Sequence, residues 1–249
     1  MRAIGAASRL AAVLAVGVLA LAAVGCGGDG DDPPTVFAAA SLTDVLPRIE
    51  PEARYSFGGS NQLAVQIEEG APADVFASAS SDLAQALRRK GLIEEPVPLA
   101  SNRLVVVVPA SNPAGIASAR DLDRDGVRVV MGAAGVPAGD YARTALAALG
   151  LSRVVARAVS QEPDVKGVLG KVATGEADAG LVYVTDARAA GDRVRAIAIP
   201  ARAAPDVHYE IAVVVGSPHA AAARDLVARV IGPDGRRALA GAGFVLPLS

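Results

Sequence analysis

The chain has 249 residues, a formal net charge of -2 and 52% hydrophobic residues, which is enough apolar material for a globular core. It contains no Trp, only 3% aromatic residues and no basic cluster, which argues against nucleic-acid binding. Its single cysteine cannot form an internal disulfide, so the fold must be stabilised by burial.

The N-terminal segment has the pattern of a signal peptide. Two arginines precede an uncharged apolar run at 10–24, which is too short for a comfortable membrane span. Small residues before Cys26 resemble the lipobox of bacterial lipoproteins, although Ala23 stands where that motif usually has Leu, Val or Ile. We predict a signal peptide at 1–25 and lipidation of Cys26, with an ordinary buried thiol in a leader as the alternative. Residues 26–34, rich in Gly, Asp and Pro, are predicted to carry the lipid and form a flexible tether.

Beyond the tether, short apolar runs alternate with segments of helical periodicity, which is typical of sheets flanked by helices. The predicted strands lie at 35–39, 54–57, 74–77, 103–108, 126–131, within 151–158, and at 180–184, 194–199 and 209–215. The predicted helices lie at 42–50, 61–69, 81–90, 137–149, 164–174, 220–231 and 235–240. The strand at 103–108 is apolar almost throughout, as expected of a strand buried on both faces.

The element order predicts an α/β fold with mostly parallel sheets and two lobes. Two long strands, near 103–109 and 208–215, bracket a middle segment of the size of a small domain. We therefore assign residues 35–107 plus 208–249 to lobe 1 and residues 108–207 to lobe 2, joined by a two-strand hinge.

No motif for catalysis or for binding a metal cation is present in the sequence. Residues 121–126 match only the first half of a calcium loop, because the twelfth position is Gly132 instead of Glu. Residues 167–171 lack the spacing and the hydroxyl of a phosphate loop. His208 and His219 are not spaced as a metal-binding pair, and no Gly-x-Ser-x-Gly elbow occurs. We expect no enzyme, no cofactor and no direct cation ligands, and interpret both histidines as surface or structural.

Four loops at the starts of predicted helices are the main functional signal. They contain Ser41, Ser60, Ala138 and Val165, and none of them contains Lys or Arg. Helix N-termini present unpaired N–H groups and the positive end of the dipole, so several that converge bind an anion without any cation. Each loop alone is compatible with plain helix capping. The four together favour an anion site.

Six strings carry a resemblance to a known family. They are VFAAASLTDVL (36–46), SNQLAVQIEEGAPADVFASAS (60–80), NRLVVVVP (102–109), VPAGDYARTAL (136–146), EPDVKGVL (162–169) and GLVYVTDA (180–187). In this order they resemble the bacterial molybdate-binding proteins of ABC transporters, over nearly all of the predicted mature chain. The resemblance implies a periplasmic-binding-protein-like fold with a ligand cleft between two lobes.

The resemblance also implies which groups hold the ligand: two serines, two backbone amides and a tyrosine hydroxyl. The matching residues here are Ser41, Ser60, Ala138, Val165 and Tyr183. Two departures occur, because Gly58 and Gly59 stand where Ala or Ser is usual and Asn61 replaces a frequent second serine. The implied activity is capture of molybdate, and also of tungstate, outside the cytoplasm for delivery to an ABC permease and its ATPase. The implied state is a monomer held at the membrane through Cys26.

Other ligands and roles remain open at this level. A donor-only cage should reject protonated oxyanions such as hydrogen phosphate, whereas sulfate must be excluded by size. Sugars usually need stacking aromatics and amino acids need a charged clamp, and the loops offer neither. A binder of another tetrahedral oxyanion such as sulfate, a sensor, and an enzyme on the same fold are the alternatives. The sequence does not separate molybdate from tungstate.

Overall fold

The computed structural model describes residues 32–247. The predicted signal peptide, Cys26 and most of the predicted tether lie outside these residues. No helix between residues 32 and 247 combines the length and the apolar character needed to span a bilayer.

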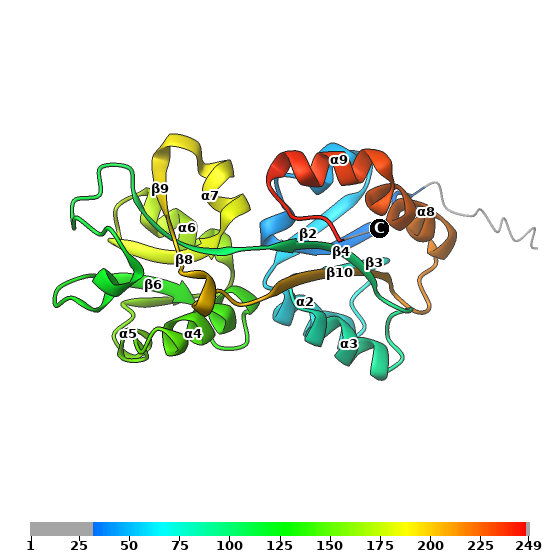
Figure 1. The fold of residues 1–249 in the computed structure, drawn as a ribbon. Helices are drawn as coiled ribbons and strands as arrows, with labels where there is room; N and C mark the ends of the chain where they lie inside the picture. The colour runs from blue at the N-terminus through cyan, green and yellow to red at the C-terminus, as the bar shows by residue number, and fades with distance from the viewer. Residues whose placement is uncertain (1–31, 248–249) are drawn as a thin grey trace, which may run out of the picture. The chain divides into compact units, whose positions relative to one another are not determined.

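The first sheet has the strand order β2-β1-β3-β10-β4. Its strands are β1 (Thr35–Ala39), β2 (Arg54–Gly58), β3 (Val75–Ser78), β4 (Val97–Asn102) and β10 (Val207–Val213). Helices α2 (Ser60–Glu68) and α3 (Ser81–Arg89) cover one face, where Phe37 and Phe76 pack against Leu63 and Leu87. The other face is covered by α1 (Leu46–Ile49), α8 (Ala220–Ile231) and α9 (Pro233–Ala242) (Figure 1).

The second sheet has the strand order β7-β6-β8-β5-β9. Its strands are β5 (Leu104–Pro109), β6 (Val129–Gly132), β7 (Ser160–Glu162), β8 (Ala179–Tyr183) and β9 (Val194–Ala198). Its α-helices are α4 (Pro137–Ala148), α5 (Arg153–Ala156), α6 (Val165–Ala173) and α7 (Val184–Ala190), with α6 and α7 over one face and α4 and α5 over the other (Figure 1). Four 3-10 turns complete the described chain: η1 (Ala40–Leu42), η2 (Ala119–Asp123), η3 (Gly191–Arg193) and η4 (Ala201–Ala203). Every residue of β5 is buried, as its apolar sequence predicts.

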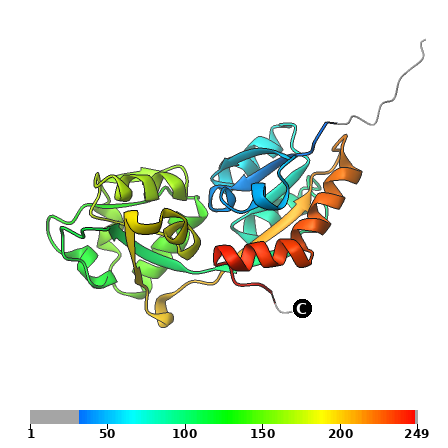
Figure 2. The same ribbon diagram turned by 90° about the horizontal axis from the view of Figure 1, so that it is seen from above.

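Each sheet with its covering helices is called a lobe below, lobe 1 for the first and lobe 2 for the second. The chain passes from lobe 1 to lobe 2 at Arg103, between β4 and β5, and returns between β9 and β10 (Figures 1 and 2). The predicted boundary at 107/108 therefore falls inside β5, which pairs only with β8 and β9. The apolar run predicts a buried strand, but its partners are distant in sequence, so the run alone does not say which sheet it joins.

The sheets are mixed rather than mostly parallel. Four strand pairs are parallel, and four, all of which involve β5 or β10, are antiparallel. The two strands that follow a crossing between lobes run against their neighbours, because each enters its new sheet from the side of the other lobe. The parallel strands all come from strand-helix-strand units, which the sequence pattern does predict.

One strand was missed and one predicted strand was wrong. β4 was missed because Pro98, Ser101 and Asn102 do not look like a strand, but β4 is the edge strand of its sheet, where proline is tolerated. The strand predicted within 151–158 is instead the short helix α5, followed by β7 at Ser160–Glu162. The adjacent valines suggested a strand, but only Val154 is fully buried, as in one turn of an amphipathic helix.

Candidate ligand-binding site

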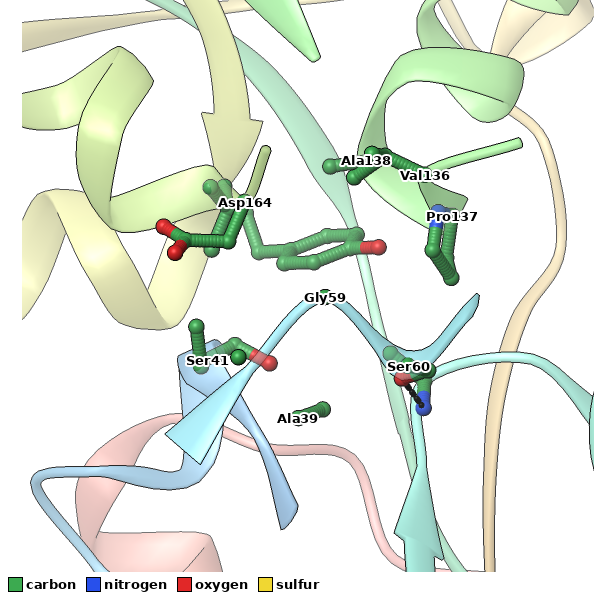
Figure 3. A pocket seen from close by; sticks show the side chains of 13 residues that line it. Ala39, Ser41, Gly59, Ser60, Val136, Pro137, Ala138 and Asp164 are labelled. Atoms are coloured by element: carbon green, nitrogen blue, oxygen red, sulfur yellow. Dashed lines mark hydrogen bonds between the residues drawn. The ribbon is translucent and has the colours of Figure 1, made fainter. Parts of the chain in front are cut away.

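A pocket between the two lobes is formed at the C-terminal ends of six strands. Sheets with parallel strands commonly bind ligands at this edge, where helices begin. The pocket is lined by Ala39, Ala40, Ser41, Gly58, Gly59, Ser60, Ala79, Val136, Pro137, Ala138, Asp164, Val165 and Tyr183 (Figure 3). The structure therefore brings together all five residues that the sequence analysis selects, from both lobes.

The pocket is small. Its cavity volume is about 20 Å³. Pockets for organic ligands are typically about 300–1,000 Å³. None of the lining residues described within 32–247 is Lys or Arg, so a bound anion would meet hydroxyls and backbone amides.

Both serines have an oxygen that already accepts, or is positioned to accept, a hydrogen bond from a protein group. The backbone N–H of Ala79 donates to Ser60 Oγ over 3.0 Å. Ser41 Oγ lies 2.7 Å from the hydroxyl of Tyr209, which is behind the pocket in β10. Ser41 and Ser60 are both buried, so neither hydroxyl is held by bulk solvent.

The backbone donors come from the first turns of α4 and α6. Pro137 and Ala138 open α4, and the amides of a first turn have no partner inside the helix. At α6 the carboxylate of Asp164 accepts from the N–H groups of Lys166 and Gly167, over 2.8 and 3.0 Å. Within residues 32–247 the N–H of Val165 has no such acceptor, so it can donate to a ligand. Figure 3 shows the Asp164 carboxylate directed away from Ser60 and Pro137, which limits its repulsion of an anion.

Tyr183 supplies a hydroxyl with no protein partner. Its side chain is 1% exposed, and its hydroxyl makes no hydrogen bond with any residue of the described chain. Burial raises the pKa of this hydroxyl well above its ordinary value, so the group stays protonated and can donate. A buried polar group without a partner is costly, and a ligand oxygen in the pocket would supply the missing acceptor.

The two lobes approach each other closely at Gly59. A Cβ atom at this position would lie 2.5 Å from the carbonyl oxygen of Pro163 in lobe 2 and 2.7 Å from Asn61 Oδ1. Real Cβ atoms do not approach backbone oxygens so closely. Glycine at 59 thus allows the lobes to meet at the pocket.

An ion pair also crosses between the lobes beside the pocket. Lys166 of α6 lies 2.5 Å from Asp44, which follows η1, and 3.3 Å from the buried carboxylate of Asp186 in α7. Burial alone would lower the pKa of Lys166, but the two carboxylates outweigh it and the pKa is raised. Burial raises the pKa of Asp186 to about 6 despite the lysine.

This raised pKa predicts a pH-dependent stability. Folded Asp186 keeps its proton where the unfolded carboxyl, at 3.8, has lost it, so its contribution to the free energy of unfolding falls as pH rises through about 6. The difference between these two pKa values corresponds to on the order of 3 kcal/mol. In urea unfolding of wild type and Asp186→Asn, we expect the free energy of unfolding of the wild type to fall relative to that of the variant by up to that amount between about pH 4 and 7. A difference between the two proteins that is constant over this range would contradict the assignment.

Other polar clusters have structural partners. His208 Nδ1 lies 2.9 Å from Ser101 Oγ, and His219 Nδ1 lies 3.2 Å from Asp74, which also accepts from Ser217. Asp121 in the acidic segment at 121–126 accepts from two backbone N–H groups of its own turn. Within residues 32–247, no three His, Cys, Asp or Glu side chains are grouped so as to hold a metal ion.

Comparison with known proteins identifies the family. The model of the family described as bacterial extracellular solute-binding proteins matches residues 34–245. The chain belongs to this family. It is 39% identical to the molybdate-binding protein ModA of Mycobacterium tuberculosis, over 85% of this chain and 84% of that protein. It is 37% identical to ModA of Haemophilus influenzae, over 84% and 89% of the two chains.

The solved structures agree on the fold. The periplasmic molybdate-binding protein of Azotobacter vinelandii superposes with a TM-score of 0.76 at 23% identity, covering 86% of this chain and all of that one. The predicted two-lobed binding-protein fold is confirmed, and so is the predicted family. As a member of a family of solute-binding proteins of ABC importers, the chain is extracytoplasmic.

Proposed function

We propose that this protein captures molybdate between its lobes and delivers it to an ABC permease and its ATPase. The observation that carries the proposal is the convergence of two serine hydroxyls, the first amides of two helices and an unpartnered buried tyrosine hydroxyl on one small pocket without Lys or Arg. The relatives named as molybdate-binding proteins support this choice of anion over sulfate.

The energetics suit a dianion. Hydrogen bonds to a charged group contribute about 1.5–3 kcal/mol each, and the pocket offers about five such donors. A cage of neutral donors leaves no uncompensated buried cation when it is empty. Because the donors come from both lobes, the ligand stabilises the arrangement in which the lobes meet. The permease would recognise this arrangement of the lobes.

Several finer features belong to the same proposal. Tungstate is expected to bind as well, because nothing in the pocket distinguishes two tetrahedral dianions of nearly equal size. We further propose a signal peptide that ends before Cys26, lipidation of that cysteine as the anchor at the outer face of the membrane, and a monomeric, non-catalytic protein. Treatment of cells with a labelled fatty acid, with Cys26→Ser as the unlabelled control, tests the anchor.

Calorimetric titration tests the capture. The chain from residue 32 would be titrated in turn with molybdate, tungstate, sulfate and phosphate. One-to-one binding of the first two, with sulfate and phosphate much weaker, is the expected result. If none of the four binds, the proposed function is wrong. If sulfate binds most tightly, the protein is a carrier of a different oxyanion.

The serines give a residue-level test of the same site. Ser41→Ala and Ser60→Ala each remove one hydrogen-bond donor to the dianion, and we expect molybdate to bind roughly tenfold to a hundredfold more weakly in each. Ser101→Ala is the matched control, because that hydroxyl contacts His208 and does not line the pocket. Equal losses in all three variants would indicate a general effect on the fold.

A further inference from the structure

A chain of buried side chains leads from the crossing between the lobes to Ser41. Asn102, the last residue of β4, receives a hydrogen bond at Oδ1 from the N–H of Arg103 over 2.9 Å. Its Nδ2 lies 2.9 Å from Thr185 Oγ1 in lobe 2 and 3.4 Å from the hydroxyl of Tyr209. The Tyr209 hydroxyl in turn lies 2.7 Å from Ser41 Oγ.

The chemistry of these groups determines the direction of every hydrogen bond in the chain. A backbone N–H only donates, so the amide oxygen of Asn102 must face Arg103 and the amide nitrogen must face the two hydroxyls. The oxygen of Tyr209 therefore accepts from Asn102. Among the described residues, Ser41 Oγ is the acceptor within reach of the Tyr209 hydrogen, so Tyr209 donates to Ser41.

The consequence lies at the pocket. Because Ser41 Oγ accepts from Tyr209, its own hydrogen is free to point at the ligand. Tyr209 is held rigidly in this position, since it is 1% exposed and its ring packs edge-on against two other rings. Its ring centroid lies 6.0 Å from that of Tyr183 and 5.4 Å from that of Phe244. Burial also raises the pKa of Tyr209, which keeps its proton on the hydroxyl. Ser60 is oriented in the same way by the N–H of Ala79.

We propose that Asn102 and Tyr209 are positioning residues that fix Ser41 as a hydrogen-bond donor, and that they thereby make the pocket selective for fully deprotonated oxyanions. This inference rests on the proposed function. A protonated oxyanion needs an acceptor for its hydrogen, and a serine locked as a donor does not offer one. Neither residue lines the pocket, so both act through Ser41.

The test compares molybdate with phosphate in a Tyr209→Phe variant. Phenylalanine keeps the ring contacts and removes the donor, so the Ser41 hydroxyl can turn either way. We expect molybdate to bind about tenfold more weakly and phosphate, measured by competition at millimolar concentration, to bind no more weakly than before, so that selectivity narrows. A loss of the same factor for both anions would show a merely structural role and overturn the proposal.

A second variant reverses the chain instead of breaking it. In Asn102→Asp the carboxylate accepts from Tyr209, Tyr209 accepts from Ser41, and Ser41 presents a lone pair to the ligand. Molybdate binding should then fall further than in Tyr209→Phe, and wild-type affinity in this variant would overturn the proposal even if Tyr209→Phe does not fold. Thr185→Val is the matched control, because it removes the other hydrogen bond of the same amide and should leave selectivity unchanged.

The outcomes separate this inference from the proposed function. If the wild-type protein binds no molybdate, the proposed function fails and the positioning role of Asn102 and Tyr209, which rests on it, fails with it. If the wild-type protein binds molybdate and Tyr209→Phe matches it in both affinity and selectivity, only the positioning role fails.

Discussion

Gly59→Ala is expected to weaken molybdate binding strongly while the separate lobes stay folded. The added methyl group would lie 2.5 Å from the Pro163 carbonyl oxygen of the opposite lobe, and neither backbone segment can yield like the end of a flexible side chain. Forced overpacking typically costs about 1–3 kcal/mol, which corresponds to roughly fivefold to 150-fold in affinity if the cost falls only on the arrangement in which the lobes meet. Calorimetric titration of the variant measures this loss directly.

Gly58→Ala is the matched control. Gly58 also lines the pocket, but a Cβ atom there would meet only the side chain of Leu63, at 3.8 Å, which is an ordinary contact within lobe 1. We expect near wild-type affinity. Similar losses in both variants would mean that any side chain in this loop disturbs the pocket, and the specific role of the Gly59–Pro163 approach would be wrong.

The approach at Gly59 gives a physical reason for a glycine at this position of the chain. The glycine was visible in the sequence as an exception, but its reason lies in Pro163, about a hundred residues away along the chain and in the other lobe. The same holds for Lys166, which the sequence places at the start of a helix and the structure places against Asp44 of the opposite lobe.

Local chemistry made most of the site predictable. Ser41, Ser60, Ala138 and Val165 stand at strand-to-helix turns, and such turns on parallel strands open at one edge of a sheet, so the predicted convergence follows from the strand-helix pattern. Tyr183 was different, because nothing about its own strand marks it as a ligand group. Only the family motif selected it, and the structure then shows its buried, unpartnered hydroxyl.

Pairing between distant segments was not predictable. β4 carries a proline and polar residues, so it was missed, yet its last residue Asn102 orients Tyr209. β5 was identified as a strand, but the predicted boundary at 107/108 divides it, because an apolar run does not specify that its partners are β8 and β9. Asn102 and Tyr209, which position Ser41 from behind the pocket, lie next to the two crossings between the lobes. No local sequence pattern therefore marked them.

Tyr183→Phe is expected to separate ligand affinity from stability. The hydroxyl of Tyr183 is buried without a protein partner, so its removal should leave the thermal stability of the ligand-free protein unchanged or slightly higher. The same hydroxyl would donate to the dianion, and loss of a hydrogen bond to a charged group costs about 1.5–3 kcal/mol, or roughly tenfold to 150-fold in affinity. Titration calorimetry and thermal melts with and without molybdate measure the two effects.

Tyr55→Phe gives the opposite pattern and serves as the control. The Tyr55 hydroxyl donates to the carbonyl oxygens of Leu46 and Glu50, at 3.1 and 2.9 Å, and lies outside the pocket. Its loss should lower the melting temperature and leave molybdate affinity unchanged. If Tyr183→Phe instead melts earlier than wild type and binds molybdate equally well, the Tyr183 hydroxyl has a structural partner and no part in the site. Removal of a group that contributes only to binding would not lower the stability of the ligand-free protein.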